Sequence, residues 1–383
     1  MYIVMKRIIP FNLPYVSGTE ISNFKEVIKN KKFSGRGIFT KKCEDYLIKH
    51  YDRQCLLTTS CTHALETTAF LLNFKKNDEI IVPSYTFVST ANAFAIRGAK
   101  VIFSDSYHNS PCIDPQSIIK KITKKTVALC IVHYAGISCD MREILKICKK
   151  HNLKLIEDCA HSFDAFGSNR KLGTFGDFAT LSFHDTKNII SGEGGALLIK
   201  KKSDYERARV IIEKGTNRSK FIDGKIKKYS WVSLGSSYEL SEINACFLNA
   251  QLKKSKKILK KRKTIFNFYK KELMSLVNKN YFLTPFIPSY AKVNGHIFYI
   301  LLNKNKDLIN LKNYAKLNGV ILQDHYECLH KSPFIDKSRK SITLPNSEMY
   351  ASRLLRLPIY PSLTVTNMKK VVRVIKEFFN TAK

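Results

Sequence analysis

The chain has 383 residues and a formal net charge of +34, from 65 lysine and arginine residues against 31 aspartate and glutamate residues. That length is enough for two domains with large cores. No run approaches the roughly 18 apolar residues that a membrane-spanning helix needs, so no membrane segment is expected. The basic residues are mostly lysines dispersed along the chain rather than gathered in one arginine–aromatic stripe, which disfavours a nucleic-acid-binding surface. A generally positive surface would instead help to attract a phosphorylated substrate.

Ten cysteines lie at irregular spacings, and no two of them form a Cys-x-x-Cys pair. This pattern suggests neither a zinc site nor a disulfide framework, so no metal is expected. Cys43, Cys55, Cys130 and Cys148 stand in or beside apolar runs, and we predict that they are buried free thiols. Free thiols fit a reducing compartment, and the cytoplasm is the predicted location.

Apolar runs and helix-like stretches alternate along the first half of the chain. The predicted strands are Glu79–Pro83, Lys100–Ser104, Thr126–Val132, Lys154–Glu157, Ala179–Phe183 and Ala196–Ile199. The predicted helices between them include Thr62–Phe74, Phe87–Ile96, Gln116–Ile122 and Met141–His151. Because the strands are continuously apolar, we expect helices on both faces of the sheet. The sequence thus predicts an α/β fold with a mainly parallel central sheet, which binds its ligand at the carboxyl ends of the strands.

The pattern changes after Gly235. A long lysine-rich helical stretch is expected from about Ser241 to Met274. Beyond it, a short strand (Ile297–Leu302) mixes with helices (Leu308–Asn318 and Asn367–Phe379). We therefore predict a large domain over residues 1–245 and a smaller C-terminal α+β domain over residues 246–383.

A hydroxyl-rich turn opens the first of these helices. The run from Leu56 to Leu65 contains three threonines and a serine just before an apolar helix. The free N–H groups and the dipole at such a helix start favour the binding of a phosphate group. We predict a phosphate site at this turn.

Two adjacent carboxylates, Glu157 and Asp158, end the strand that begins at Lys154, in an otherwise uncharged stretch. A buried carboxylate needs a cationic partner or several hydrogen-bond donors. Pyridoxal phosphate supplies such a partner, because its protonated ring nitrogen pairs with an aspartate. On the residues alone, either carboxylate could take this role.

A single lysine, Lys187, lies in the polar turn between two apolar strands, and the glycine-rich segment 192–195 follows it. An ordinary solvated lysine is the simplest interpretation of one lysine in a lysine-rich chain. A lysine at a strand end becomes a nucleophile when its surroundings lower its pKa, as Schiff-base chemistry requires. A phosphate site, a carboxylate and a lysine, in this order along the chain, together predict a site for pyridoxal 5'-phosphate.

The chain resembles the DegT/DnrJ family of sugar-nucleotide aminotransferases, which are fold-type I pyridoxal phosphate enzymes, and within it the branch that makes dTDP-4-amino-4,6-dideoxygalactose. The similarity runs almost unbroken from about residue 10 to about residue 255 and thins beyond. The matching stretches are Pro10–Pro14, Thr59–Thr62, Pro83–Asn92, Arg97–Lys100, Val132–Gly136, Ser182–Asn188, Gly192–Gly195, Glu213–Arg218, Leu234–Tyr238, Phe298–Tyr299, His325–Tyr326 and Arg353–Pro358.

This resemblance implies a role for each candidate cofactor residue. Lys187 would bond covalently to the cofactor and then act as the base that moves a proton. Asp158, rather than Glu157, would pair with the ring nitrogen, because the family places that residue directly before a small Cys/Ala-Ala segment. The phosphate would be held by Thr62, by backbone N–H groups around Cys61, and by Ser182. Tyr85 would stack on the ring, with a core tyrosine as the alternative, and His161 would approach the ring hydroxyl.

Three further residues are candidates for the substrate or for a second subunit. His184 would contact substrate or shape the turn. Arg218 resembles a residue of the 4-amino-sugar branch and suits a phosphate, with an ordinary surface arginine as the alternative. Many relatives carry an asparagine where this chain has Ser236-Ser237, and that asparagine reaches the partner's phosphate; Ser237 could still donate. A homodimer with active sites at its interface is implied.

The implied reaction moves the amino group of L-glutamate to the 4-keto carbon of dTDP-4-dehydro-6-deoxy-D-glucose. Its product, dTDP-4-amino-4,6-dideoxy-D-galactose, would serve the synthesis of a surface polysaccharide such as O antigen. Amination at C3 or formation of the gluco epimer are alternatives within the family. A pyridoxal sugar dehydratase is disfavoured because that branch carries histidine in place of Lys187. A catalytically silent homologue and a basic nucleic-acid binder are alternatives from other classes.

Overall fold

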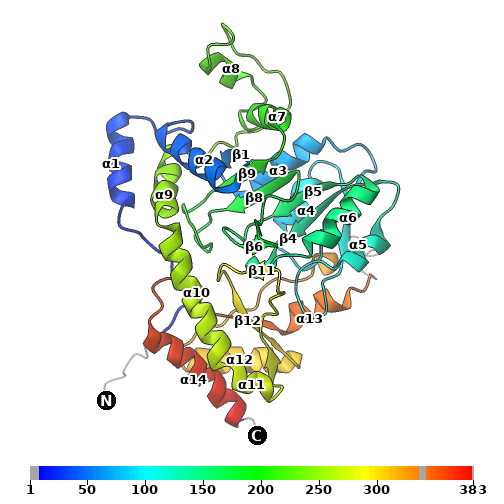
Figure 1. Ribbon diagram of the computed structural model, residues 1–383, viewed down its shortest axis with the longest axis vertical. Helices are drawn as coiled ribbons and strands as arrows, with labels where there is room; N and C mark the ends of the chain where they lie inside the picture. The colour runs from blue at the N-terminus through cyan, green and yellow to red at the C-terminus, as the bar shows by residue number, and fades with distance from the viewer. Residues whose placement is uncertain (1–7, 336–341, 382–383) are drawn as a thin grey trace.

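The computed structural model describes residues 8–335 and 342–381, and a seven-stranded sheet forms its centre (Figure 1). Its strands are β1 (Gln54–Thr58), β2 (Glu79–Pro83), β3 (Lys100–Ser104), β4 (Thr126–Val132), β5 (Lys154–Asp158), β8 (Phe178–Ser182) and β9 (Gly195–Ile199), in the spatial order β1-β9-β8-β5-β4-β2-β3. Strands β3, β2, β4, β5 and β8 are parallel, and β9 is antiparallel to both β8 and β1. The predicted fold class, with a mainly parallel sheet, is confirmed.

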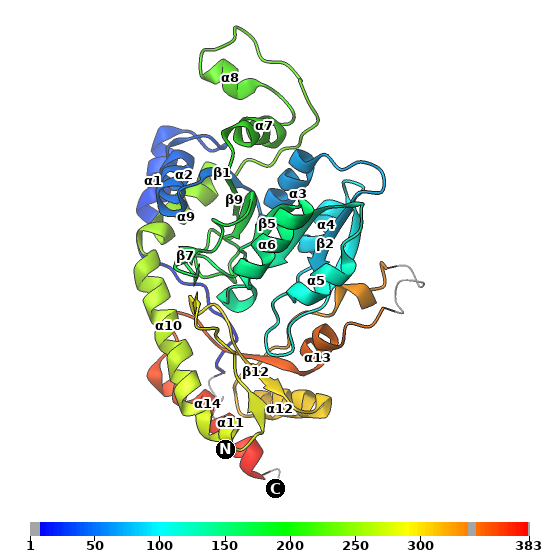
Figure 2. The ribbon, with the colours of Figure 1, turned by 45° about the vertical axis from the view of Figure 1, so that its right-hand side comes forward.

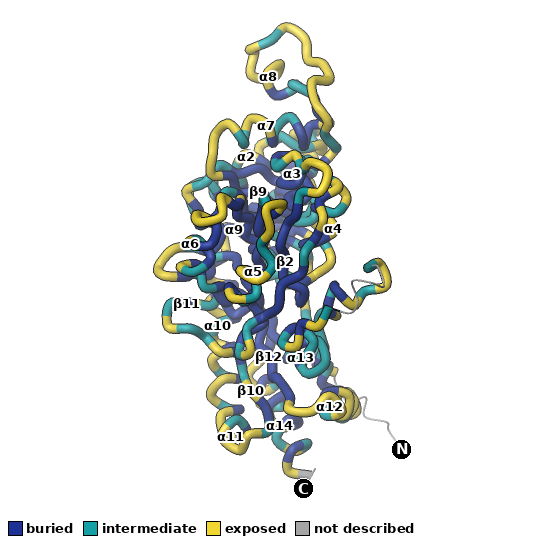
Figure 3. Tube along the Cα trace, turned by 90° about the vertical axis from the view of Figure 1, so that its right-hand side faces the viewer, coloured by how far each residue is buried: buried dark blue, intermediate teal, exposed yellow. Residues whose placement is uncertain are grey.

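Helices cover both faces of this sheet, because its strands are apolar on both sides. In β4, Leu129 and Ile131 face one core, whereas Ala128 and Cys130 face the other. The first core is covered by α2 (Ile38–Tyr51), α5 (Pro115–Lys121), α6 (Met141–His151) and α9 (Glu242–Lys253). The second is covered by α3 (Cys61–Leu72), α4 (Ser89–Ala95) and α7 (Lys202–Ile212). Figure 3 shows the buried strands between these partly exposed helices. Cys43, Cys55, Cys130 and Cys148 are buried free thiols, as predicted.

A second, three-stranded sheet lies below the first in Figure 1. Its strands, in spatial order, are β10 (Phe282–Leu283), β12 (Phe298–Leu302) and β13 (Leu354–Leu357). The helices of this part are α10 (Ser255–Glu272), α11 (Met274–Asn278), α12 (Asn305–Leu317), α13 (Pro345–Arg353) and α14 (Val365–Thr381). Strand β12 joins the two parts: Phe298 and Ile300 pack in the core of the second sheet, and Tyr299 and Leu301 pack in a core of the first. A third small sheet, β11 (Ala291–Lys292), β6 (Phe166–Gly167) and β7 (Arg170–Lys171), also links them.

The long helix predicted from Ser241 to Met274 is divided into α9, α10 and α11. Its first break falls at Lys254, which has φ −105° and ψ 5°. The boundary predicted at residues 245/246 lies inside α9, where Ala245 and Leu252 pack in a core of the large sheet. The division into two domains at that point stays a prediction.

Residues 213–239, here called the arm, leave the body of the protein beyond α7 (Figures 1 and 2). The arm carries the short helix α8 (Arg218–Ile222), and its base is closed by a bridge between Glu213 and Ser237. Helix α1 (Glu20–Asn30) packs against α9, where Asn23 donates to the carbonyl of Cys246. In the part of the chain that the structure describes, no helix is long and apolar enough to cross a bilayer.

Candidate active site

A cavity of about 740 Å³ lies where β4, β5 and β8 end and the second sheet approaches the first. The three parallel strands contribute their last residues, Val132, Asp158 and Ser182. Arg356 and Leu357 of β13 line the cavity from the other side. This is the edge of an open α/β sheet at which ligands bind, as the sequence predicted.

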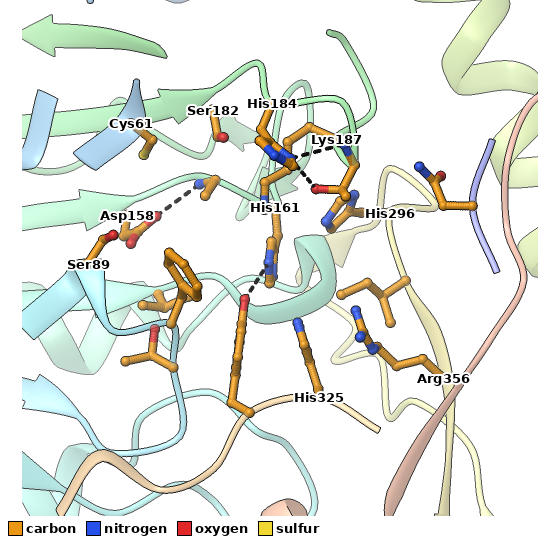
Figure 4. A pocket seen from close by; sticks show the side chains of 18 of the residues that line it. Cys61, Ser89, Asp158, His161, Ser182, His184, Lys187, His296, His325 and Arg356 are labelled. Carbon is orange, nitrogen blue, oxygen red and sulfur yellow. Dashed lines mark hydrogen bonds between the residues drawn. The ribbon is translucent and has the colours of Figure 1, made fainter. Parts of the chain in front are cut away.

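The cavity brings together most of the residues that were proposed from the sequence (Figure 4). Those that line it are Cys61, Thr62, Asp158, His161, Ser182, His184 and Lys187. Tyr85, Arg218 and Ser237 do not line it.

The start of α3 forms one end of the cavity and fits a phosphate group. The side chain of Ser60 caps the helix by accepting a hydrogen bond from His63 N. The first N–H groups of a helix have no partner within it, so they are available to an anion. The Thr62 hydroxyl lies 2.8 Å from that of Ser89, which also lines the cavity. Ser89 was not among the predicted site residues.

Gly195, at the start of β9, lets this strand lie close to the start of α3. A Cβ at this position would collide with Cys61 N and the carbonyl of Ser60. We expect Gly195→Ala to weaken the binding of pyridoxal 5'-phosphate by about tenfold or more, since overpacking typically costs about 1–3 kcal/mol. Equilibrium dialysis of the apo protein measures this affinity. Gly98→Ala is the control: a Cβ there meets no atom within 4 Å, and only the positive φ of Gly98 strains the backbone of the variant. Equal weakening by both changes would show that α3 is not positioned by Gly195.

Asp158 and Glu157 occupy different environments, although they are neighbours on β5. Asp158 is buried at the cavity wall and accepts hydrogen bonds from Ala160 N at 3.0 Å and from the Thr90 hydroxyl at 2.9 Å. Burial raises the pKa of its carboxyl, against the effect of these two donors. A cationic ligand atom in the cavity would stabilise the charged carboxylate. Asp158 therefore fits a protonated ring nitrogen.

Glu157 points away from the cavity and is fully surrounded by donors. It accepts hydrogen bonds from His133 Nε2 at 3.0 Å and from the backbone N–H groups of Gly173, Phe175 and Gly176. Burial acts to raise the pKa of Glu157, but the bonds from His133 and the backbone outweigh it and lower the pKa. Its charge is thus satisfied by the protein itself, which leaves the ligand role to Asp158.

Lys187 lies in the turn after β8, where its backbone N–H donates to the carbonyl of His184 at 2.9 Å. Burial lowers the pKa of its amine, and the positive charge of Arg356 lowers it further, whereas Cys61 and Asp158 act in the opposite direction. A lowered pKa increases the fraction of uncharged amine, which is the nucleophilic form. The turn is anchored by Asn188, whose Oδ1 lies 2.8 Å from His296 Nδ1.

Two histidines near Lys187 hold different positions. His161 is buried, and its Nδ1 accepts a hydrogen bond from Ala135 N, so the proton lies on Nε2, which faces the Tyr326 hydroxyl at 3.1 Å. His184 is half-buried and also lines the cavity. Its Nδ1 accepts a hydrogen bond from Thr186 N, so the side chain shapes the turn as well as facing the cavity.

Tyr85 is not placed as expected for the stacking ring. Its side chain is buried in the core against Tyr134, Tyr326 and Tyr350. The aromatic side chain that lines the cavity from this segment is Phe87, which is 56% exposed. Tyr85 is therefore a core tyrosine, which was the alternative interpretation. Phe87 is the better candidate for stacking on the cofactor ring.

Arg218 and Ser237 belong to the arm (Figure 1), and neither of them lines the cavity of its own chain. The roles predicted for them would therefore involve a second subunit.

The C-terminal part supplies several cavity residues that the sequence did not assign. These are Arg262, His296, Ile297, Gln323, His325, Tyr326, Arg356, Leu357 and Ile359. The only sequence signals for these cavity residues were the matches to the family at His325–Tyr326 and over Arg353–Pro358, and neither match had been given a role. Figure 4 shows His325 and Arg356 across the cavity from Cys61 and Asp158.

The sequence and the fold match known proteins over nearly the whole chain. The model of the DegT/DnrJ/EryC1/StrS aminotransferase family matches residues 14–376. An uncharacterized protein of Methanocaldococcus jannaschii, MJ1066, is 32% identical over 383 aligned residues, which cover 96% of each chain. A GDP-perosamine synthase of Escherichia coli O157:H7 is 29% identical, covering 97% of this chain and 99% of that protein.

Solved structures share the fold at lower identity. The aminotransferase TlmJ from Streptoalloteichus hindustanus superposes with a TM-score of 0.90 at 23% identity, covering 98% of this chain and 100% of that one. Helicobacter pylori PseC, an aminotransferase of pseudaminic acid biosynthesis, gives a TM-score of 0.90 at 23% identity with the same coverage. With Lys187, Asp158 and the start of α3 around one cavity, this chain belongs to the DegT/DnrJ/EryC1/StrS aminotransferase family of pyridoxal phosphate-dependent sugar aminotransferases.

Proposed function

We propose that this enzyme transfers the amino group of L-glutamate to the C4 keto carbon of a nucleoside diphosphate-linked 4-keto-6-deoxy sugar. The observation that carries the proposal is the position of Lys187 in one cavity with Asp158 and the start of α3. The similarity to the 4-amino-sugar branch suggests dTDP-4-dehydro-6-deoxy-D-glucose as acceptor and dTDP-4-amino-4,6-dideoxy-D-galactose as product. The relatives named GDP-perosamine synthase favour a GDP-linked acceptor as the second candidate.

The residues divide the work in a way that follows from their environments. Pyridoxal phosphate, when bound, supplies an electron sink for the carbon that loses a proton. Lys187, with its lowered pKa, accepts and returns that proton. Asp158 stabilises positive charge at the ring nitrogen, and the start of α3 with Thr62 and Ser182 holds the phosphate. Phe87, which lines the cavity, would stack on the cofactor ring.

Product analysis distinguishes the two acceptors. Purified holoenzyme is incubated with L-glutamate and either dTDP-4-dehydro-6-deoxy-D-glucose or the GDP-linked 4-keto sugar, and the product is identified by NMR. An amino group at C4 of one of them is the expected result, and the configuration at C4 separates the galacto from the gluco epimer. Amination at C3, or no amination of either sugar, would contradict the proposal.

We also propose that the active enzyme is a homodimer. Exposed apolar side chains lie on α1 (Ile21, Phe24 and Ile28) and on the arm, where Trp231 is 75% exposed. Exposed apolar surface of this kind marks association sites, and twofold dimers are the commonest closed assembly. Light scattering at assay concentration should give about twice the chain mass of 44.0 kDa. A fully active species with the mass of one chain would rule the dimer out.

Arg218 is proposed to contact the diphosphate of the sugar nucleotide bound to the partner. Arg218→Ala should raise KM for the sugar nucleotide by about tenfold to a hundredfold and leave KM for glutamate unchanged, since a charge-assisted contact is worth roughly 1.5–3 kcal/mol. Steady-state kinetics with each substrate varied in turn measures the difference. Lys220→Ala, at an exposed position of the same helix, is the control. Equal effects on both substrates would assign Arg218 to the fold or to the surface.

A further inference from the structure

Two arginines line the cavity on the side that the C-terminal part supplies. Arg262 of α10 is buried, and its Nε and Nη2 donate to the carbonyls of Gly295 and His296 at 3.1 and 2.8 Å. Arg356 of β13 donates from Nε and Nη2 to the carbonyl of Asp324 at 3.1 and 2.7 Å. Its guanidinium lies over the ring of Phe11, 4.7 Å from the centroid. Both side chains are therefore fixed by neutral partners.

Neither arginine has an acidic counterpart in the part of the chain that the structure describes. Across residues 8–335 and 342–381, no carboxylate oxygen lies within 4.0 Å of either guanidinium. The two carboxylates of the cavity wall have other neighbours: Asp158 accepts from Thr90 and Ala160, and Glu193 lies 3.6 Å from His184. Arg262 is buried and Arg356 is half-buried. A cation that is withdrawn from water without a counter-ion is costly unless a ligand supplies the opposite charge.

The uncompensated charge acts across the cavity. Burial lowers the pKa of Arg262 to about 9, so its guanidinium stays protonated at neutral pH. Burial also lowers the pKa of His325 and His161, and the charge of Arg356 lowers both further. These histidines therefore stay neutral and add no competing positive charge. An anion in this part of the cavity would face the two arginines without a repelling carboxylate.

We propose that Arg356, supported by Arg262, binds a carboxylate of the amino donor. The inference rests on the proposed function, because it assumes that an amino acid enters this cavity. In an α-amino acid the carboxylate and the reacting amine share one carbon, so the group that binds the carboxylate must lie close to the reacting centre. Arg356 meets this condition, because it lines the same cavity as Lys187 and its positive charge acts on the Lys187 amine. A guanidinium also matches a carboxylate in geometry and can bind it through two parallel hydrogen bonds.

A sugar-nucleotide phosphate is the other anion that this arginine could bind. The diphosphate is joined to C1 of the sugar, across the ring from a reacting C4, and so lies farther from Lys187 than a donor carboxylate does. The arm, with Arg218, offers a separate set of cations for that diphosphate. Arg356 lines the same cavity as Lys187, whereas the arm does not, and this favours the carboxylate as its ligand.

Glutarate tests this assignment, because it carries the two carboxylates of the donor and has no amine to react. Its dissociation constant for the holoenzyme is measured by calorimetry for the wild type, Arg356→Gln and Arg353→Gln, with dTDP and GDP titrated in parallel. Arg353 lies three positions earlier, where its Nε donates to Asn305, and it does not line the cavity. Arg356→Gln should raise the dissociation constant of glutarate by about tenfold or more and that of each nucleotide by less than about twofold. Arg353→Gln should change all of these dissociation constants by less than about twofold. Unchanged glutarate affinity in Arg356→Gln, or loss of nucleotide binding instead, would overturn the proposal.

If Arg356→Gln does not fold, the affinities of two ligands for the wild-type enzyme can be compared instead. Glutaramide has nearly the shape of glutarate but no charge, so the holoenzyme should bind it at least about tenfold more weakly. Equal affinity for the two compounds would mean that no cationic subsite exists. Neither titration depends on turnover, so a failure to aminate a sugar would contradict the proposed function while leaving this inference separately testable.

Discussion

Lys187→Ala should abolish transamination and the visible absorbance of the cofactor–enzyme linkage. The side chain is the only lysine among the described residues that line the cavity, and burial lowers the pKa of its amine. Loss of the general base alone removes about 10²–10⁴-fold in rate, and loss of the covalent link adds to this. Absorbance spectra of the purified variant and single-turnover assays with L-glutamate measure both effects.

Lys200→Ala is the matched control for this change. Lys200 directly follows β9, is exposed, and does not line the cavity. Its replacement should leave spectrum and rate as in the wild type. Full activity in Lys187→Ala would show that the base and the cofactor link belong to another residue.

Asp158→Asn should lower the rate of the reaction, whereas Glu157→Gln should lower the stability of the fold. Asp158 faces the cavity, whereas Glu157 faces the interior of the protein, so only Asp158→Asn removes a charge from the ligand site. Breaking a buried charge pair costs about 3–5 kcal/mol, so Asp158→Asn should lower kcat by about a hundredfold or more. The fold should remain, because Asp158 accepts only two hydrogen bonds from the protein.

Glu157→Gln should instead lower the melting temperature. The carboxylate accepts bonds from His133, Gly173, Phe175 and Gly176, and the amide nitrogen of glutamine would face one or more of these donors. Each lost bond to a charged acceptor costs roughly 1.5–3 kcal/mol. Calorimetry and kinetics on the folded fraction separate the two effects. A larger loss of kcat in Glu157→Gln than in Asp158→Asn would move the ring-nitrogen role to Glu157.

The central sheet could be predicted from the sequence because its strands are buried on both faces. The ranges Glu79–Pro83, Lys100–Ser104 and Thr126–Val132 agree with β2, β3 and β4 residue for residue. Strand β1 was missed, since its run Gln54–Thr58 leads directly into the turn that was read as the approach to α3. The break at Lys254 has no glycine or proline to mark it, and the start of α10 (Ile258 and Leu259) packs in the same core as α9. The core of the second sheet takes α10 only from Ile265 onward.

The choice between Tyr85 and Phe87 could not be made from the sequence. Both are aromatic and lie in the same short segment after β2, and both fit an apolar environment. The three tyrosines that surround Tyr85 include Tyr326 and Tyr350, which are distant in sequence and reach it only through the folded C-terminal part. The cavity arginines were missed for the same reason: Arg262 and Arg356 come together through α10 and β13, which carry no local motif for a ligand.

Borohydride reduction of the purified holoenzyme, followed by peptide mass spectrometry, identifies the residue that holds the cofactor. Reduction fixes the cofactor to the amine that holds it, so the modified peptide identifies the residue. One modified lysine is expected, Lys187, in the segment that contains Ser182 and His184. Modification of a different lysine, or of none in a protein that binds the cofactor, would contradict the assignment of Lys187.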